Sequence, residues 1–168
     1  MRVFISSGTG ADGSAYLAEI LHAFGLCFVE RQPLRNALKA ANPKQDLLLL
    51  PAGSEAAGVE SFLHAGGNVV AIQPDESLER LAGLARKKED AGPTRLRLTQ
   101  AVCRAVRGEP LWTLGTVRLY EPKPGPDVIA YLFKSSDKTG EAIGIVENSV
   151  GAGRLVVYAY DPALCITR

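Results

Sequence analysis

The sequence predicts an α/β protein: a three-layer sandwich around a parallel sheet, with an antiparallel C-terminal extension. The first observation is the stretch 46–75, DLLLLPAGSEAAGVESFLHAGGNVVAIQPD, in which two apolar runs flank a short helical pattern. Runs such as Leu47–Leu50 and Val69–Ile72, apolar without alternation, are typical of strands that are covered on both faces. The second observation is that strand and helix patterns alternate up to about residue 90, whereas short strands follow one another beyond it.

The N-terminal half, about residues 1–90, is expected to form the parallel core. The expected elements are strands at 2–6, 26–29, 47–50 and 68–72 and helices at 14–25, 34–41, 59–65 and 76–87. Ser14 and Asp75 are residue types that cap helix N-termini, Pro33 suits the first turn of the second helix, and Gly66 suits a left-handed helix end. This order predicts right-handed crossovers that place helices on both faces of the sheet.

The C-terminal half, about residues 91–168, has a different pattern. The segments TRLRLTQ, LWTLGTVRLYEP, DVIAYLFKSS, EAIGIVEN and GRLVVYAYDP are typical of strands separated by Gly, Pro, Asp and Ser turns. Most of them are too close together for helical crossovers, which predicts antiparallel hairpins that extend the parallel sheet or stand against it. Because no low-complexity linker separates the halves, we expect residues 1–168 to form one domain.

Composition argues against several classes of partner. The 168 residues include 19 basic and 18 acidic side chains, and the only basic run, Arg86–Lys88, is interpreted as a solvated helix end. Nucleic acid and anionic membrane are therefore not expected, and no apolar run approaches the ~20 residues of a membrane span.

The cysteines Cys27, Cys103 and Cys165 lie far apart, without the spacing of a metal site or the even count of a disulfide framework. They predict free, mostly buried thiols and a reducing, cytoplasmic location. The final residues, AYDPALCITR, stay apolar, and we interpret the chain as the N-terminal domain of a longer protein.

The loop Gly8–Gly13 reads GxGxxG between a strand and a helix, and Glu30 ends the next strand. In the dinucleotide-binding fingerprint, glycines such as Gly8 and Gly10 admit a pyrophosphate to the helix N-terminus. Asp12 would place a negative charge beside the phosphates, however, and the helix begins after the third glycine rather than near the second. A flexible loop is the simpler interpretation, and we expect no bound cofactor.

Two further loops follow predicted strands and supply candidate ligand-binding residues. Gly53 and Ser54 could donate hydrogen bonds to a carbonyl or an anion, or form a simple turn. Gln73 and Asp75 occupy the strand-to-helix elbow where hydrolases and amidotransferases place a nucleophile. No Ser or Cys stands in that elbow, and both histidines lie on predicted helices, so the sequence indicates no catalytic residue.

With these residues in view, the chain resembles the class I glutamine amidotransferase-like superfamily. It is similar to that superfamily's non-amidotransferase branches, the trehalose-utilisation-like domains and the β-galactosidase trimerisation domains. The resemblance rests on residues 46–75 and on the late VGAGRLVVYAYDP, and the matching positions are Gly66, Gly67, Gly151, Gly153, Arg154 and Asp161. It implies a flavodoxin-like, amidotransferase-like sheet. Glutaminase chemistry is not implied, because Gln73-Pro74-Asp75 replaces the elbow cysteine and no downstream His-x-Glu is present.

These observations favour a non-catalytic binding or assembly module, accessory to a carbohydrate-handling protein. The expected partner is another domain of a longer chain or a second copy, with a small polar ligand or a carbohydrate as ligand. Aromatic residues in or beside the late strands suit an association surface or the sheet's own core: Trp112, Tyr120, Tyr131, Phe133, Tyr158 and Tyr160. Two alternatives remain: a hydrolase using Ser54, Gln73 and Asp75 at the carboxyl edge of the sheet, and nucleotide binding through Gly8–Gly13.

Overall fold

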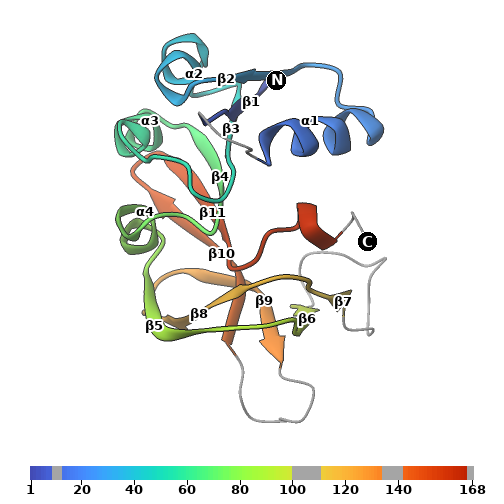
Figure 1. Cartoon of the computed structure of the whole chain (residues 1–168). Helices are drawn as coiled ribbons and strands as arrows, with labels where there is room; N and C mark the ends of the chain where they lie inside the picture. The colour runs from blue at the N-terminus through green and yellow to red at the C-terminus, as the bar shows by residue number, and fades with distance from the viewer. Residues whose placement is uncertain (9–12, 100–110, 134–141, 166–168) are drawn as a thin grey trace.

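The computed structural model of the protein describes residues 1–8, 13–99, 111–133 and 142–165. The described strands are β1 (Val3–Ser6), β2 (Val29–Gln32), β3 (Leu47–Leu50), β4 (Asn68–Ile72), β5 (Leu84–Ala91), β6 (Arg95–Leu98), β7 (Leu111–Trp112), β8 (Val117–Pro122), β9 (Asp127–Phe133), β10 (Ala142–Val150) and β11 (Gly153–Tyr158). Within this part of the chain, nine strands form one mixed sheet in the order β2-β1-β3-β4-β11-β10-β9-β6-β7, and β5 pairs with β8 in a second sheet (Figure 1).

The parallel part of the sheet contains the predicted βαβ unit. β3 and β4 pair in parallel, Leu48 opposite Val69, and β1 joins β3 on the other side with Phe4 opposite Leu48. Leu48, Val69 and Ile72 are at most 1% exposed, as expected of strands that are covered on both faces. The order β2-β1-β3-β4 is that of doubly wound α/β sheets, in which the chain extends the sheet first in one direction and then in the other.

The last strand, β11, connects the two parts of the sheet. It forms an antiparallel hairpin with β10 and lies parallel to β4, so one late strand of the chain sits in the middle of the sheet. β10, β9, β6 and β7 then continue the sheet as antiparallel strands, as the spacing of the C-terminal segments predicts.

The two faces of the sheet are covered unequally. The helices α2 (Leu34–Ala40), α3 (Val59–His64) and α4 (Glu76–Leu81) lie on one face, whereas α1 (Ser14–Ala23) and the 3-10 helix η2 (Ala163–Cys165) lie on the other (Figure 1). The larger hydrophobic cluster packs under α2, α3 and α4 and continues beneath the antiparallel strands. The smaller cluster packs under α1 and η2. The predicted α/β class is confirmed, but helix content is low and the predicted three-layer sandwich is not confirmed.

One predicted helix is wrong in its second half. The helix expected over residues 76–87 ends at Leu81, Gly83 adopts a left-handed φ of 68°, and the chain continues as strand β5. Arg86–Lys88 therefore lies in a strand and is not a helix end. Pairing of β5 with the distant β8 overrides the local helical pattern, and the ion pairs Arg86–Asp90 and Lys87–Glu121 form along the two strands.

Smaller differences concern the start of α1 and the second strand. Gly13 and not Ser14 is the N-cap of α1; Ser14 is fully buried and its hydroxyl accepts two hydrogen bonds from Arg31. The second strand runs from Val29 to Gln32 and not from 26 to 29, because the backbone N–H of Leu26 still closes the end of α1 on Leu21. Gly66, with a φ of 97°, confirms the predicted left-handed end of α3.

The expectation of buried thiols is wrong for Cys27, which is exposed; Cys165 is half-buried, and Cys103 lies outside the described residues. Both described cysteines are free thiols. No helix among the described residues is long and apolar enough to cross a membrane. Of the aromatic residues in the C-terminal half, Tyr120 and Tyr160 are buried, whereas Trp112 is 55% exposed.

Candidate functional site at the carboxyl edge of the parallel strands

Several sequence-predicted site residues come together at the carboxyl edge of the parallel strands. Gly8 follows β1, Gly53 and Ser54 follow β3, and Gln73 and Asp75 follow β4. Because β1, β3 and β4 are neighbours in the sheet, these loops lie in the same order along one edge. α1 and α3 leave this edge toward opposite faces, which makes the gap between β1 and β3 the switch point where open α/β sheets bind ligands. Gly10 lies outside the described residues.

Gln73 has the most unusual backbone at this edge. Its φ is 44°, the left-handed region, and it is the only residue other than glycine with a positive φ among the described residues. Its backbone N–H donates to the carbonyl of Tyr158 at 2.9 Å, which ties the end of β4 to the end of β11. A strand-to-helix elbow is therefore present in this chain, and its strained position holds a glutamine.

The side chain of Gln73 forms hydrogen bonds that join two parts of the fold. Its amide nitrogen Nε2 donates to the carbonyl of Thr116 at 2.7 Å and to the carbonyl of Ala159 at 3.3 Å. Thr116 precedes β8 and Ala159 follows β11, so the amide joins the second sheet to the main sheet. A carboxamide is neither a nucleophile nor a general base, and this one is held in place by two acceptors.

Asp75 acts as the N-cap of α4, as its sequence position predicts. Its Oδ1 accepts from the backbone N–H of Leu78 at 3.1 Å and from the hydroxyl of Ser77 at 2.7 Å. A cap of this type stabilises a helix by about 1 kcal/mol. The carboxylate is exposed and its hydrogen bonds are local, which is the pattern of a helix start.

Gly53 and Ser54 form a turn after β3. Gly53 has a left-handed φ of 78°, and the backbone N–H of Ser54 donates to the carbonyl of Pro51 at 3.1 Å. Gly53 is exposed, and Ser54 is half-buried.

A buried polar network lies directly behind the elbow, and sequence reasoning did not find it. Glu79 is 3% exposed and its Oε1 accepts from the hydroxyl of Tyr120 at 2.8 Å and from the guanidinium of Arg118 at 3.1 Å. The same guanidinium donates to the carbonyl of Pro74 in the elbow. The only sequence signal is that Arg118 and Tyr120, two apart in β8, must share one face of a strand.

The network changes the acid–base properties of its tyrosine. Burial raises the pKa of Tyr120 above its ordinary value, and the hydrogen bond to the Glu79 carboxylate raises it further. Burial likewise raises the pKa of Tyr160, with Tyr158 and Cys165 acting in the same direction. Both hydroxyls therefore stay protonated over the physiological range, and neither is available as a base.

The side chains that could complete a hydrolytic triad lie elsewhere. His64 is on α3 beside the β10–β11 turn, at the amino edge of the sheet, and its Nε2 lies 3.8 Å from Oε1 of Glu60. His22 and Cys27 lie toward the same edge, at the end of α1 and in the loop before β2. No group of three or more His, Cys, Asp and Glu side chains among the described residues could hold a metal ion.

The comparisons with known proteins show a fold and no closer relationship. No protein-family model matches the sequence, and no curated protein matches it. Among solved structures, β-galactosidase from Bacillus circulans sp. alkalophilus superposes with a TM-score of 0.68 at 13% identity, covering 98% of this chain and 29% of that one. α-L-Fucosidase isoenzyme 2 from Paenibacillus thiaminolyticus gives 0.68 at 15% identity, covering 95% and 29%.

A smaller protein shares the fold over most of its length. Cytoplasmic protein STM1381 from Salmonella typhimurium LT2 has a TM-score of 0.64 at 13% identity, and the match covers 96% of this chain and 88% of that one. The chain thus spans less than a third of the length of the two glycosidases and most of the length of the smaller protein. At these identities the likeness shows the fold alone, and it is partly consistent with the superfamily that the sequence resembles.

Proposed function

We propose that this chain is a non-catalytic binding or assembly module of amidotransferase-like fold, accessory to a carbohydrate-handling protein. The observation that carries the proposal is Gln73. The elbow that exposes a nucleophile in hydrolases of this architecture here holds a carboxamide, and both of its donors are engaged with the carbonyls of Thr116 and Ala159. The neighbouring Asp75 caps a helix, so the elbow supplies neither an attacking group nor a base.

Two further findings support the accessory role. The β-galactosidase and the α-L-fucosidase that share the fold are chains more than three times as long, so the fold accompanies other domains in carbohydrate-active proteins. The free thiol of the exposed Cys27 suits a reducing compartment, which supports the cytoplasmic location proposed from the sequence. We further propose that residues 1–168 are one domain of a longer protein.

The alternative of a hydrolase at the carboxyl edge is tested with chromogenic substrates. The purified chain is incubated with p-nitrophenyl β-galactoside, p-nitrophenyl α-fucoside and a p-nitrophenyl ester, beside Ser54→Ala and Asp75→Asn variants. We expect no turnover of any substrate above that of the heat-unfolded protein. Turnover by the native chain that disappears in Ser54→Ala or Asp75→Asn would overturn the non-catalytic reading.

The nucleotide alternative is tested by thermal stability. A ligand present at a hundred times its dissociation constant stabilises a fold by about 2.7 kcal/mol, a shift that a melting curve resolves easily. We expect no change in melting temperature with millimolar NAD, NADP or ATP. A rise that is lost in Gly10→Ala would favour nucleotide binding through Gly8–Gly13.

A further inference from the structure

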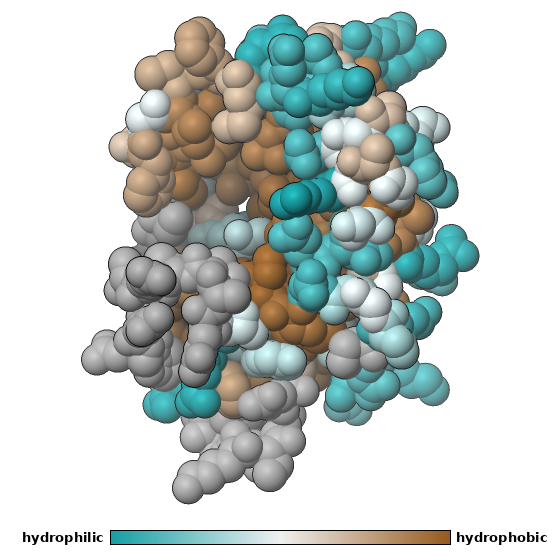
Figure 2. Space-filling model, turned by 180° about the vertical axis from the view of Figure 1, so that it is seen from behind, coloured by the Kyte–Doolittle hydropathy of each residue, from teal (hydrophilic) through white to brown (hydrophobic). Residues whose placement is uncertain are grey.

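An apolar groove lies on the sheet face that, among the described residues, carries α1 and η2. The cavity between these helices has a volume of about 260 Å³ and its floor is formed by β1, β3, β4 and β11. Its lining residues are Met1, Val3, Leu17, Ile20, Leu21, Leu26, Leu47, Leu49, Val70, Ile72, Tyr158, Pro162 and Ala163. All of them are apolar except Tyr158. Figure 2 shows apolar residues gathered around α1, at the upper left, with a hollow beside them.

The rim of this groove presents a large exposed aromatic side chain. Leu17, Ile20 and Leu21 of α1 line the cavity, and Phe24 continues their stripe at helical spacing just beyond the helix end. The backbone N–H of Phe24 still donates to the carbonyl of Ile20, which keeps it in helical register. Its side chain is nevertheless 78% exposed, the highest value among the large hydrophobic residues of the described chain.

The exposed area on this rim is large enough to form half of a small interface. Met1 is 76% and Leu26 is 37% exposed, and both line the cavity itself. Taking about 150–250 Å² for a large side chain, Phe24, Met1 and Leu26 together expose roughly 370 Å². Two copies meeting through this rim would bury at most about 750 Å² from these side chains, which is below the about 1,000 Å² of a stable specific interface and is the size of a weak, transient one.

We infer that this groove is a self-association surface in which Phe24 of one copy enters the cavity of a second copy related by a two-fold axis. The inference rests on the proposed function, because it specifies the partner of the assembly module. A two-fold interface requires a surface complementary to itself, and here a protruding ring and a hollow lie side by side on one face. An apolar cavity of about 150 Å³ already holds benzene, so one of about 260 Å³ admits a phenyl ring.

Charge does not oppose this association. The formal net charge of the chain is +1, so two copies repel each other only weakly at long range. The groove lining carries no charged side chain, which matches the depletion of charge at interface centres. The small area places the dimer at the weak end of specific complexes, with a dissociation constant in the micromolar range.

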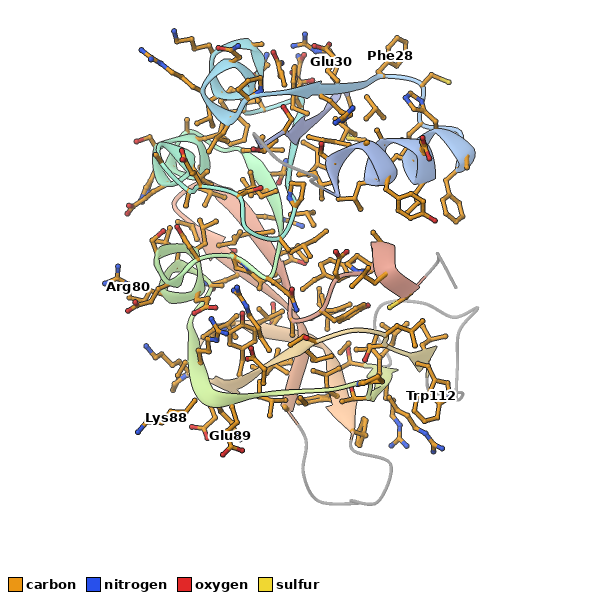
Figure 3. The ribbon with its side chains drawn as sticks, viewed as in Figure 1. Phe28, Glu30, Arg80, Lys88, Glu89 and Trp112 are labelled. Carbon is orange, nitrogen blue, oxygen red and sulfur yellow. The ribbon has the colours of Figure 1, made fainter. Side chains whose placement is uncertain are left out.

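Phe28 provides a matched control. Its side chain is 71% exposed, almost as much as that of Phe24, and Figure 3 shows it pointing outward at the β2 edge of the molecule. The next residue, Val29, packs against the hydrophobic cluster under α1. Because neighbouring residues of an extended segment point to opposite sides, Phe28 faces away from the groove.

Sedimentation velocity from 1 to 200 µM tests the inference on the wild-type chain, Phe24→Ser, Phe28→Ser and Leu26→Lys, after circular dichroism has shown that all four are folded. We expect a monomer–dimer equilibrium for the wild type and for Phe28→Ser. The dissociation constant should rise at least tenfold in Phe24→Ser, which loses the ring, and in Leu26→Lys, which places a charge at the mouth of the cavity.

A mixing experiment distinguishes insertion of the Phe24 ring from non-specific hydrophobic association. Phe24→Ser keeps its cavity and Leu26→Lys keeps its ring, so an equimolar mixture should form heterodimers more tightly than either variant forms homodimers. A wild type that stays monomeric to 200 µM, equal weakening by Phe28→Ser, or a mixture no tighter than its components overturns the inference. Such a result leaves the non-catalytic reading intact, because that reading is tested separately by turnover.

Discussion

Replacement of Gln73 tests whether the elbow of this protein is structural. In Gln73→Ala the carbonyls of Thr116 and Ala159 each lose a donor, and one link between the second sheet and the main sheet is removed, although the backbone N–H of Arg118 still donates to the carbonyl of Ala159. Each of these hydrogen bonds stabilises the fold by about 1 kcal/mol. We therefore expect Gln73→Ala to lower the free energy of unfolding by about 2 kcal/mol, a large part of the 5–15 kcal/mol that is typical of a domain.

Gln73→Gly separates the side chain from the backbone. It loses the same two hydrogen bonds but relieves the left-handed φ of 44°, which costs a residue with a Cβ about 1–2 kcal/mol. The greater freedom of glycine in the unfolded chain offsets about 0.5–1 kcal/mol of this gain. Gln73→Gly should therefore be more stable than Gln73→Ala by about 0.5–1 kcal/mol, although both are less stable than the wild type.

Gln73→Glu tests the direction of the hydrogen bonds. A carboxylate has the same shape as the amide but cannot donate, so at neutral pH it would face two carbonyl oxygens. We expect it to be less stable than Gln73→Ala. Urea denaturation followed by far-UV circular dichroism measures all three variants at constant m-value. A Gln73→Ala variant within 0.5 kcal/mol of the wild type, or a glycine variant no better than the alanine variant, would refute the structural role of the elbow.

The remaining predictions concern sites that hold the fold together. Gly153→Ala should lower the free energy of unfolding by more than about 3 kcal/mol or fail to fold, because a Cβ there would collide with the backbone carbonyls of Leu63 and Gly67. Gly92→Ala has open space around it and should change the free energy of unfolding by no more than about 0.5 kcal/mol. Thermal melting compares the two variants. Glu79→Gln should cost about 2–4 kcal/mol in urea denaturation, because Arg118 would keep a part-buried charge without its carboxylate. Burial of Asp46 opposes its ionisation, but hydrogen bonds from the guanidinium and backbone of Arg2 and the backbone of Asn42 outweigh burial and lower its pKa to about 2. The Asp46 carboxylate contributes about 1–2 kcal/mol to the free energy of unfolding, after allowance for the exposed Arg2 side chain. This contribution should be complete above about pH 4 and fall between pH 4 and pH 2, and the same pH dependence should be absent in Asp46→Asn. Tyr120 gives a pH dependence of the opposite sign: its pKa is raised in the folded state, so the stability that it contributes should be lost as the pH rises above about 10. In Tyr120→Phe the free energy of unfolding, measured by circular dichroism, should therefore depend less on pH in this alkaline range.

Local sequence signals were sufficient for the parallel core and for several of its turns. Uninterrupted apolar runs identified β3 and β4 because the two faces of these strands pack against two hydrophobic clusters of the same molecule. Asp75 and Gly66 were predictable because a helix cap and a left-handed helix end depend on residues only a few positions away. The short spacing of the late segments predicted antiparallel strands for the same reason, since no helix fits between them.

Tertiary contacts decided the candidate site. The sequence placed Gln73 in an elbow, but only the folded chain shows that its amide reaches Thr116 and Ala159, 43 and 86 residues away. Glu79 looked like an ordinary helix residue, and its partners Arg118 and Tyr120 lie about forty residues further along the chain. Hydrogen bonds of this kind have no sequence period, because the sheet and not the local chain sets the spacing of the groups.

The uneven cover of the two sheet faces also could not be predicted from the sequence. The alternating strands and helices predicted layers on both faces, but residues 84–91 joined β8 as a strand, and α1 and η2 are the helices of the described residues that cover one face. The same apolar stripe on α1 that predicted a core helix therefore also forms the wall of a groove. Hydrophobic periodicity shows which side of a helix is apolar, whereas the number of neighbouring elements that reach that side depends on the topology of the whole chain.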